Sequence, residues 1–319
     1  MNPVTARQDL VERLLGGPRT LRRREVARAV GISLLSARKL WRALGFPGVD
    51  DEIVAFTEAD REALARTVAM VRDGVIDEAT AIAMARALGQ TTDRLVSWQT
   101  EALMEHLARQ SEADGGAPVH PVEVVDRLVD DFEKLLVYSW RRHMAAVISQ
   151  LADGPESGAE LTVGFADLVS YTRLSQRLAQ RDLGVLVQRF EGLAADLVTT
   201  GGGRVVKTVG DEVLFVADDA ADGAAIALAL QERVQAEPAL PALRIGLACG
   251  PVLVRYGDVY GEVVNIAARL TSHARPGSVL VDREMADTLA DDPRFALRPL
   301  RTLAVRGYRH LHPWLLEAR

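Results

Sequence analysis

The stretch VVKTVGDEVLF, residues 205–215, decides how the second half of the chain is expected to fold. Two apolar segments joined by a Gly-Asp pair predict a β-hairpin with a tight turn. Aspartate and glycine occur in turns for backbone reasons alone. Those reasons do not account for Lys207 in a strand that enters a core, or for the adjacent carboxylates Asp211 and Glu212 at the turn. The hairpin therefore indicates a candidate site that the rest of the chain must support or exclude.

Strand and helix patterns alternate on both sides of this hairpin. A strand and a helix are expected before it, at 161–168 and 173–200. After it we expect a helix, a pair of strands, a helix and a strand, at 222–235, 243–257, 261–273 and 277–281. The order β-α-β-β-α-β, followed by further elements, is typical of a ferredoxin-like split βαβ sheet. The second half is thus predicted to be an α+β domain.

The first 110 residues are expected to be all-helical. Residues 22–73 have the pattern of a helix-turn-helix followed by a third helix, which begins with the capping-box sequence TEAD. Two further helices are expected at 77–88 and 92–110, with Gly89 between them.

Two segments rich in Gly and Pro divide the chain. Residues 111–121 end the helical region, and Pro121 is well placed to begin a long helix that ends near Ala152. Residues 153–160 form the second break. The predicted organisation is a helical domain, a linker helix with a flexible junction and an α+β domain, at 1–112, 113–157 and 158–319.

Composition excludes several classes of protein. The chain has 319 residues, 48% of them hydrophobic and 26% charged, which is ordinary for a globular protein with two cores. Its apolar runs are too short to cross a bilayer, and no export leader is apparent. Cys249 is the single cysteine and lies in an apolar stretch, so we expect a buried, inert thiol. These features predict a cytoplasmic protein without membrane contact.

Charge is unevenly distributed along the chain. Residues 1–45 hold ten Lys and Arg against three Asp and Glu, a net charge of +7, whereas the whole chain has a net charge of −6. A basic N-terminal segment followed by an acidic remainder predicts two functions, or one function and a regulator.

Two aspartates are expected to meet at one edge of the predicted sheet. Asp167 ends the first strand and Asp211 lies in the hairpin turn, and a split βαβ fold places these strands side by side. Carboxylate oxygens without His or Cys ligands favour Mg²⁺ or Mn²⁺ over zinc. A pair of such ions suits the attack of a hydroxyl group on a phosphate. Alone, the two aspartates are a weak signal for a metal site.

The segment GDVYGEVVNIAARL, residues 257–270, adds polar side chains to this picture. Asn265 and Arg269 are four residues apart on a predicted helix and share one face. An amide beside a guanidinium can hold a sugar and a phosphate. A solvated polar face is the alternative, which the surrounding alanines and leucine make less favourable.

Together, FADLVSYT, VVKTVGDEVLF and GDVYGEVVNIAARL resemble the three signature segments of class III nucleotidyl cyclases. The resemblance covers residues 158–319. It implies an adenylyl cyclase that converts ATP to 3′,5′-cyclic AMP and pyrophosphate with two divalent cations, Mg²⁺ or Mn²⁺. It also implies that Asp167 and Asp211 bind the metal ions and that Lys207 and Asp258 recognise adenine. Asn265 would position the ribose, and Arg269 would stabilise the pentacovalent phosphate.

The same resemblance implies that the active site forms between two catalytic domains. One domain supplies the metal aspartates and the other supplies the remaining groups, so a complete set in each chain predicts a head-to-tail homodimer with two sites. Arg301 and Arg306 in the C-terminal tail are candidates for contact with pyrophosphate, although the tail departs from the usual family pattern. A Lys-Asp pair also favours ATP over GTP as the substrate.

The N-terminal half resembles two kinds of regulator. Residues 22–73 are similar to the helix-turn-helix of MerR-type proteins, in which Arg38, Lys39 and Arg42 would contact DNA phosphates, and Ser33 and Ser36 would face bases. The longer stretch through the linker helix resembles the regulatory domain of actinobacterial adenylyl cyclases, some of which respond to pH.

Our interpretation is therefore a cyclase that its N-terminal domain autoinhibits. The helix over 121–152 is expected to pair or repack between chains and so to change the placement of the catalytic domains. His143 near its end is a candidate pH sensor, because imidazole titrates near neutral pH. The alternative is a DNA-binding regulator in which residues 1–110 bind nucleic acid and the cyclase-like half serves dimerisation or nucleotide sensing.

Overall fold

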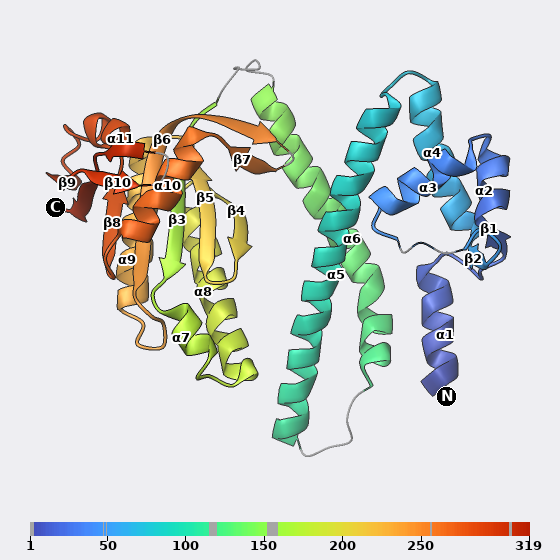
Figure 1. Cartoon of the computed structure of the whole chain (residues 1–319). Helices are drawn as coiled ribbons and strands as arrows, with labels where there is room; N and C mark the ends of the chain where they lie inside the picture. Colours follow the sequence, from blue (N-terminus) through green and yellow to red (C-terminus); the bar gives the residue numbers. More distant parts are fainter. Residues whose placement is uncertain are drawn as a thin grey trace. The chain divides into compact units, whose positions relative to one another are not determined.

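The computed structural model describes residues 3–46, 48, 50–114, 120–151, 159–255, 257–305 and 308–319. The chain divides into two compact units, Met1–Asp153 and Gly154–Arg319 (Figure 1). Within the described residues, no helix is both long enough and apolar enough to cross a membrane.

The N-terminal unit is built from helices and one short antiparallel strand pair. The elements are α1 (Pro3–Leu14), β1 (Leu21–Arg22), α2 (Arg23–Val30), α3 (Leu34–Ala43), β2 (Val54–Phe56), α4 (Glu58–Arg72), α5 (Glu78–Asp114) and α6 (Pro121–Leu151). The predicted capping box opens α4, because Thr57 N–H donates to Asp60 Oδ2 at 2.8 Å and Asp60 N–H donates to Thr57 Oγ1 at 3.3 Å. Trp41 and Phe56 pack together in the small core, with ring centroids 4.6 Å apart and the rings tilted by 52°.

The expected interruption at Gly89 was wrong, because α5 is one continuous helix of 37 residues. A Cβ atom at Gly89 would lie 2.4 Å from the backbone carbonyl carbon of Leu44, at the end of α3. The glycine therefore allows α5 to pass close to that backbone, at the cost of weaker helix propensity. Close packing, and not a helix end, explains this residue.

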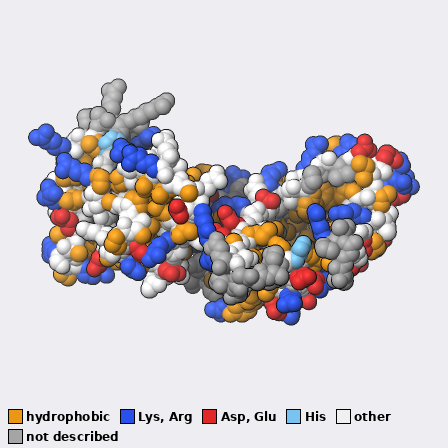
Figure 2. All heavy atoms as spheres, turned by 90° about the horizontal axis from the view of Figure 1, so that it is seen from below, with side chains coloured by type: hydrophobic (Ala, Val, Ile, Leu, Met, Phe, Trp, Pro, Cys, Tyr) orange, Lys and Arg blue, Asp and Glu red, His pale blue; other side chains and the backbone are white. Residues whose placement is uncertain are grey.

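The long helices of this unit carry many large apolar side chains that are exposed to solvent. On α6 these are Phe132, Leu135, Leu136, Val137, Tyr138, Trp140, Met144, Val147 and Ile148. We call these nine residues the α6 stripe. Hydrophobic side chains reach the surface of the molecule between charged ones in the space-filling view (Figure 2).

The C-terminal unit has an α+β fold around one large sheet, which confirms the predicted fold class. Its elements are β3 (Ala159–Leu168), α7 (Tyr171–Ser175), α8 (Gln180–Thr200), β4 (Arg204–Val209), β5 (Glu212–Ala217), α9 (Ala220–Gln235), β6 (Leu243–Arg255), β7 (Asp258–Tyr260), α10 (Glu262–His273), β8 (Ser278–Val281), α11 (Arg283–Thr288), β9 (Phe295–Pro299), β10 (Leu303–Val305), β11 (Tyr308–Leu311) and β12 (Trp314–Ala318). The strand order is β4-β5-β3-β6-β8-β12-β9, with β7 paired to β6. Its first four strands have the ferredoxin-like arrangement that the sequence predicted.

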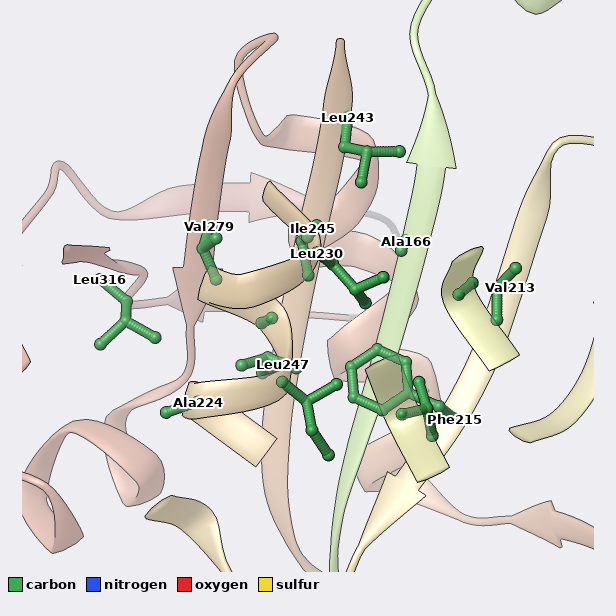
Figure 3. Close-up of a cluster of buried hydrophobic side chains, with 14 of the residues drawn as sticks. Ala166, Val213, Phe215, Ala224, Leu230, Leu243, Ile245, Leu247, Val279 and Leu316 are labelled. Carbon is green, nitrogen blue, oxygen red and sulfur yellow. The ribbon is translucent and has the colours of Figure 1, made fainter. Parts of the chain in front are cut away.

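The sheet is covered on two faces. One face packs against α8 and α9 and contains the main core, part of which is drawn in Figure 3 with Phe215, Ile245, Leu247 and Val279. The opposite face packs against α10 through a smaller cluster that includes Val263 and Ala267. Because side chains alternate along a strand, successive residues point in turn to the α8/α9 face and to the α10 face.

Two details of the sheet bear on the site. The strand pair expected over 243–257 is instead one strand of 13 residues, β6, against which β7 folds back with Leu253 opposite Tyr260. In β4 the register shifts between Val205 and Lys207, so that Lys207 lies opposite Leu214 on the α10 face.

Candidate active site

The sheet register brings four charged residues together where β3 ends. Asp167 lies opposite Glu212 of β5 on one side and opposite Arg244 of β6 on the other. Asp211 immediately precedes Glu212 in the turn, and its carbonyl oxygen accepts a hydrogen bond from Leu168 N–H at 3.1 Å. The convergence of Asp167 and Asp211 that the predicted topology required is therefore present.

Three carboxylates lie near one guanidinium in this cluster, and one of them contacts it. Arg244 Nη2 donates to Asp167 Oδ2, whose side chain is only 13% exposed. Burial raises the pKa of Asp211, the nearby Asp167 carboxylate raises it further, and Arg244 opposes the shift. Burial also raises the pKa of Glu212, together with the charges of Asp167 and Asp211. The cluster thus has an excess of negative charge that a bound cation would relieve.

The residues present fit a divalent cation of the Mg²⁺ class. Asp167 and Asp211 offer hard oxygen ligands, and a bound cation would stabilise the charged form of Asp211, whose pKa is raised without one. Among the described residues, no group of three or more His, Cys, Asp or Glu side chains is arranged to hold a metal ion. A metal at the two aspartates would therefore take its remaining ligands from water and from substrate phosphates, as Mg²⁺ commonly does.

A second pair of charged residues lies on the α10 face. Lys207 Nζ of β4 is 2.5 Å from Asp258 Oδ2 of β7, although these residues are 51 positions apart in the sequence. Burial alone would raise the pKa of Asp258, but hydrogen bonds from Lys207 and from Val259 N–H, with the lysine charge, lower it overall. Both side chains remain partly exposed, at 39% and 25%. A ligand can therefore reach a donor and an acceptor that the protein already holds side by side.

Asn265 and Arg269 lie one turn apart on the exposed side of α10. The opposite side of the helix carries Val263, Ala267 and Leu270, which are buried against the sheet. No side-chain hydrogen bond or ion pair joins Asn265 or Arg269 to another described residue. Both polar groups are thus available for a ligand, which agrees with the predicted shared face.

The other predicted site residues are less well defined. Arg301 is exposed in the segment between β9 and β10, and Arg306 lies outside the described residues. His143 is exposed on α6. Sequence reasoning missed Arg244 and did not assign a role to Glu212. The alternation in LRIGL signals that Arg244 faces away from the core, but only the antiparallel register places it against Asp167.

Several side chains expected to read DNA are engaged within the N-terminal unit. Ser33 caps α3 by accepting a hydrogen bond from Ser36 N–H at 3.0 Å, and the two hydroxyl groups are also 3.0 Å apart. Arg38 forms an ion pair with Asp51, which Arg23 also contacts at 2.7 Å. These contacts stabilise the helix-turn-helix-like segment and do not favour the DNA-binding alternative.

Known proteins are similar to this chain over its catalytic half and over most of its length. Residues 155–318 match the family described as "Adenylate and Guanylate cyclase catalytic domain". An adenylate cyclase of Glutamicibacter nicotianae is 46% identical, over 97% of this chain and 81% of the relative. A pH-sensitive adenylate cyclase of Mycobacterium tuberculosis is 33% identical, over 85% of this chain and 70% of the relative.

A solved structure is also similar to part of this chain. The catalytic core of a rhodopsin-guanylyl cyclase with converted specificity, in complex with ATPαS, is 25% identical with a TM-score of 0.47, covering 51% of this chain and 97% of that one. With the family and the relatives in agreement, the chain belongs to the class III nucleotidyl cyclases, as its three signature segments predicted.

Proposed function

We propose that this chain is an adenylyl cyclase that converts ATP to 3′,5′-cyclic AMP and pyrophosphate. The observation that carries the choice of ATP is the Lys207–Asp258 pair, with 2.5 Å between Nζ and Oδ2. The lysine can donate to a ring nitrogen of adenine while the carboxylate accepts from the exocyclic amine. Guanine presents the opposite pattern at those atoms. The relatives named adenylate cyclase support the same substrate.

The reaction forms one bond and breaks one bond at the α-phosphorus. The ribose 3′-oxygen attacks, its proton passes to solvent, and the bond to the oxygen that bridges the α- and β-phosphates breaks, which releases pyrophosphate. Two divalent cations, when bound at Asp167 and Asp211, would supply Lewis acidity for the attacking oxygen and charge neutralisation for the phosphates. Asn265 orients the ribose, and Arg269 stabilises the negative charge that grows on the α-phosphoryl oxygens.

We infer that the working enzyme is a head-to-tail homodimer, with the aspartates of one chain facing Lys207, Asn265 and Arg269 of the other. Exposed apolar side chains at the two hairpins support this inference. Val209 is 62% exposed beside the turn that carries Asp211, and Leu253, Val254 and Tyr260 are exposed on the β6–β7 hairpin that carries Asp258. Pairing two catalytic domains through these hairpins would cover apolar surface and complete both sites together.

We further propose that residues 1–112 regulate a catalytic domain at 158–319 through the linker at 113–157. The α6 stripe supports this, because a helix with so many exposed apolar residues is expected to pack against a second chain. A change in that packing would alter the placement of two catalytic domains and could hold them inactive. The pH-sensitive relative supports pH as the signal, for which His143 on α6 is the candidate sensor.

The test is cyclic nucleotide production by the full chain, with ATP and GTP compared in Mg²⁺ and in Mn²⁺. We expect cyclic AMP from ATP and at least tenfold less product from GTP. Lys207→Ala should reduce that preference by raising KM for ATP, whereas the matched change Lys134→Ala, on the exposed surface of α6, should leave it unchanged. Equal turnover of ATP and GTP by the unaltered chain would contradict the assignment of the Lys207–Asp258 pair.

A further inference from the structure

A cavity of about 630 Å³ lies in the C-terminal unit and plays no part in the proposed reaction. Its walls are Val169 and Ser170 just after β3, helix α7 with the turn that follows it, the first half of α8, and residues 238–241 before β6. The volume is within the range of pockets that bind small molecules.

The cavity has a firm apolar interior. Leu186 of α8 and Leu240 are each less than 10% exposed and belong to the main core on the α8/α9 face. Leu174 and Leu178 add to the apolar lining. Since the core holds two of these side chains in place, the cavity can bury the apolar part of a ligand without refolding.

Three arginines and a single carboxylate surround this interior. Arg173 and Arg177 are four residues apart, and neither side chain forms an ion pair or hydrogen bond with another described residue. Arg189 is oriented by an ion pair with Glu237, whose side chain is only 8% exposed. Because a guanidinium has five N–H donors, that contact leaves others for a ligand. Asp182 supplies the one opposing charge.

We propose that this cavity binds a small organic anion: a carboxylate, sulfonate or phosphate ester attached to a compact apolar body. The apolar part would lie against the leucines while the anionic group accepts hydrogen bonds from Arg173 and Arg177, a pairing for which guanidinium groups are well suited. The selectivity is local, because the chain as a whole carries a net charge of −6 and does not attract anions by its overall field.

The cavity is separate from the carboxylate cluster but connected to it through the backbone. Asp167 points to the α10 face, whereas the cavity lies on the α8/α9 side of the same strand end. Val169 N–H donates to the carbonyl oxygen of Ala242 at 2.8 Å, and Ser170, with φ of 64°, is the one described non-glycine residue in the left-handed region. A ligand touching this segment is expected to change divalent-cation affinity at Asp167, a part of the proposal that rests on the proposed function.

Calorimetry of the full chain with three naphthalene probes tests the binding. We expect naphthalene-2-sulfonate to bind with one equivalent per chain and at least tenfold more tightly than 2-naphthol or 2-naphthylmethylammonium. Arg173→Ala combined with Arg177→Ala should weaken sulfonate binding at least tenfold. Arg298→Ala, an exposed arginine on β9, is the matched control and should change it less than twofold. Saturating ATP should not displace the probe.

A second variant protects the test from a folding artefact. Ala239→Trp fills the cavity mouth without removing a charge, and it should abolish sulfonate binding while circular dichroism and melting temperature stay unchanged. Equal binding of all three probes, displacement by ATP, or an unaffected double variant would each overturn the proposal. Binding of an acidic leucine-rich peptide in place of the sulfonate would assign the surface to a protein partner and overturn it as well.

The coupling between the cavity and the cation site at Asp167 can be measured without turnover. Titration of Mn²⁺ into the chain without nucleotide should give an affinity that changes at least threefold when naphthalene-2-sulfonate is saturating. An unchanged Mn²⁺ affinity would overturn the coupling. Sulfonate binding combined with a complete lack of cyclase activity would contradict the proposed function and leave the cavity assignment supported, so the two failures are distinguishable.

Discussion

The two units of the chain treat their large apolar residues differently. In the C-terminal unit such residues fill the two faces of the sheet, and those left exposed gather mainly at the β4–β5 and β6–β7 hairpins. In the N-terminal unit, exposed apolar residues run along whole helices, above all α6. The C-terminal unit therefore has the surface of a stable domain with local contact sites. The exposed apolar helices of the N-terminal unit instead favour packing against a partner.

The largest effect is expected at Asp211, where the negative charge serves the proposed function but does not stabilise the fold. Asp211→Asn should lower cyclic AMP production by roughly 10³-fold, because it removes the charge of a proposed metal ligand. The melting temperature should stay equal or rise, since the burial and the Asp167 charge that raise the pKa of Asp211 oppose its ionisation. Product formation and thermal unfolding measured on one preparation check this. Asp218→Asn, an exposed aspartate after β5, is the control and should change neither quantity.

Truncation of a core residue should destabilise the chain more than truncation of an exposed residue on α6. Leu247 is fully buried in the main core, so Leu247→Ala is expected to lower the free energy of unfolding of the C-terminal unit by about 2–5 kcal/mol. Leu135→Ala on α6, where the side chain is 59% exposed, should change unfolding of the isolated chain by less than about 0.5 kcal/mol. Urea denaturation at low protein concentration measures both, and equal losses would show that α6 is already packed within its own unit.

The α6 stripe predicts a change in association. Leu135→Glu combined with Trp140→Glu places two charges among exposed apolar side chains, so dimers should dissociate at least tenfold more readily. Sedimentation velocity over a concentration series measures this effect. Lys134→Glu changes charge on the same helix and should have a smaller effect on association. Unaltered self-association of the double variant would refute the assignment of α6 as a contact between chains.

A pH dependence of stability is expected in the C-terminal unit. Burial raises the pKa of Asp282 to about 6, although hydrogen bonds from Met285 and Cys249 N–H groups oppose the shift. Because this folded-state pKa lies above the usual value, the stabilising contribution is present at low pH and is lost as pH rises through about 6. Asp282→Asn, which can still cap α11, should flatten the dependence of unfolding free energy between about pH 4 and pH 7. A profile identical to that of the unaltered chain would contradict this account.

The smallest effect concerns the N-terminal unit. If His143 senses pH, His143→Gln should shift the pH profile of cyclic AMP production by several tenths of a unit or more while the melting temperature is unchanged, because the side chain is exposed. His273→Gln, an exposed histidine at the end of α10, is the comparison. An unmoved profile would exclude His143 as the sensor.

The sequence predicted the C-terminal unit better than the N-terminal one for a physical reason. Hydrophobic alternation and the Gly-Asp turn are local signals, and they were enough to order the strands and to bring Asp167 and Asp211 to one edge. The ion pair of Arg244 with Asp167 depends on strand register, which a single strand does not encode. Gly89 gave a misleading local signal, because its small size serves a contact with Leu44 and not a helix end.

The register of β4 after its bulge constrains how the gene can vary. If β4 paired with β5 without a bulge at Val206, Lys207 would lie opposite Val213 and enter the main core, away from Asp258. Deletion of Thr208 with the turn at Gly210 kept in place would have the same effect, because it moves the lysine one position closer to the turn. The hairpin would remain plausible, yet the side chain proposed to contact the base would be lost. Along lineages of this enzyme, the number of residues between Lys207 and Gly210 is expected to be held more strictly than their identity.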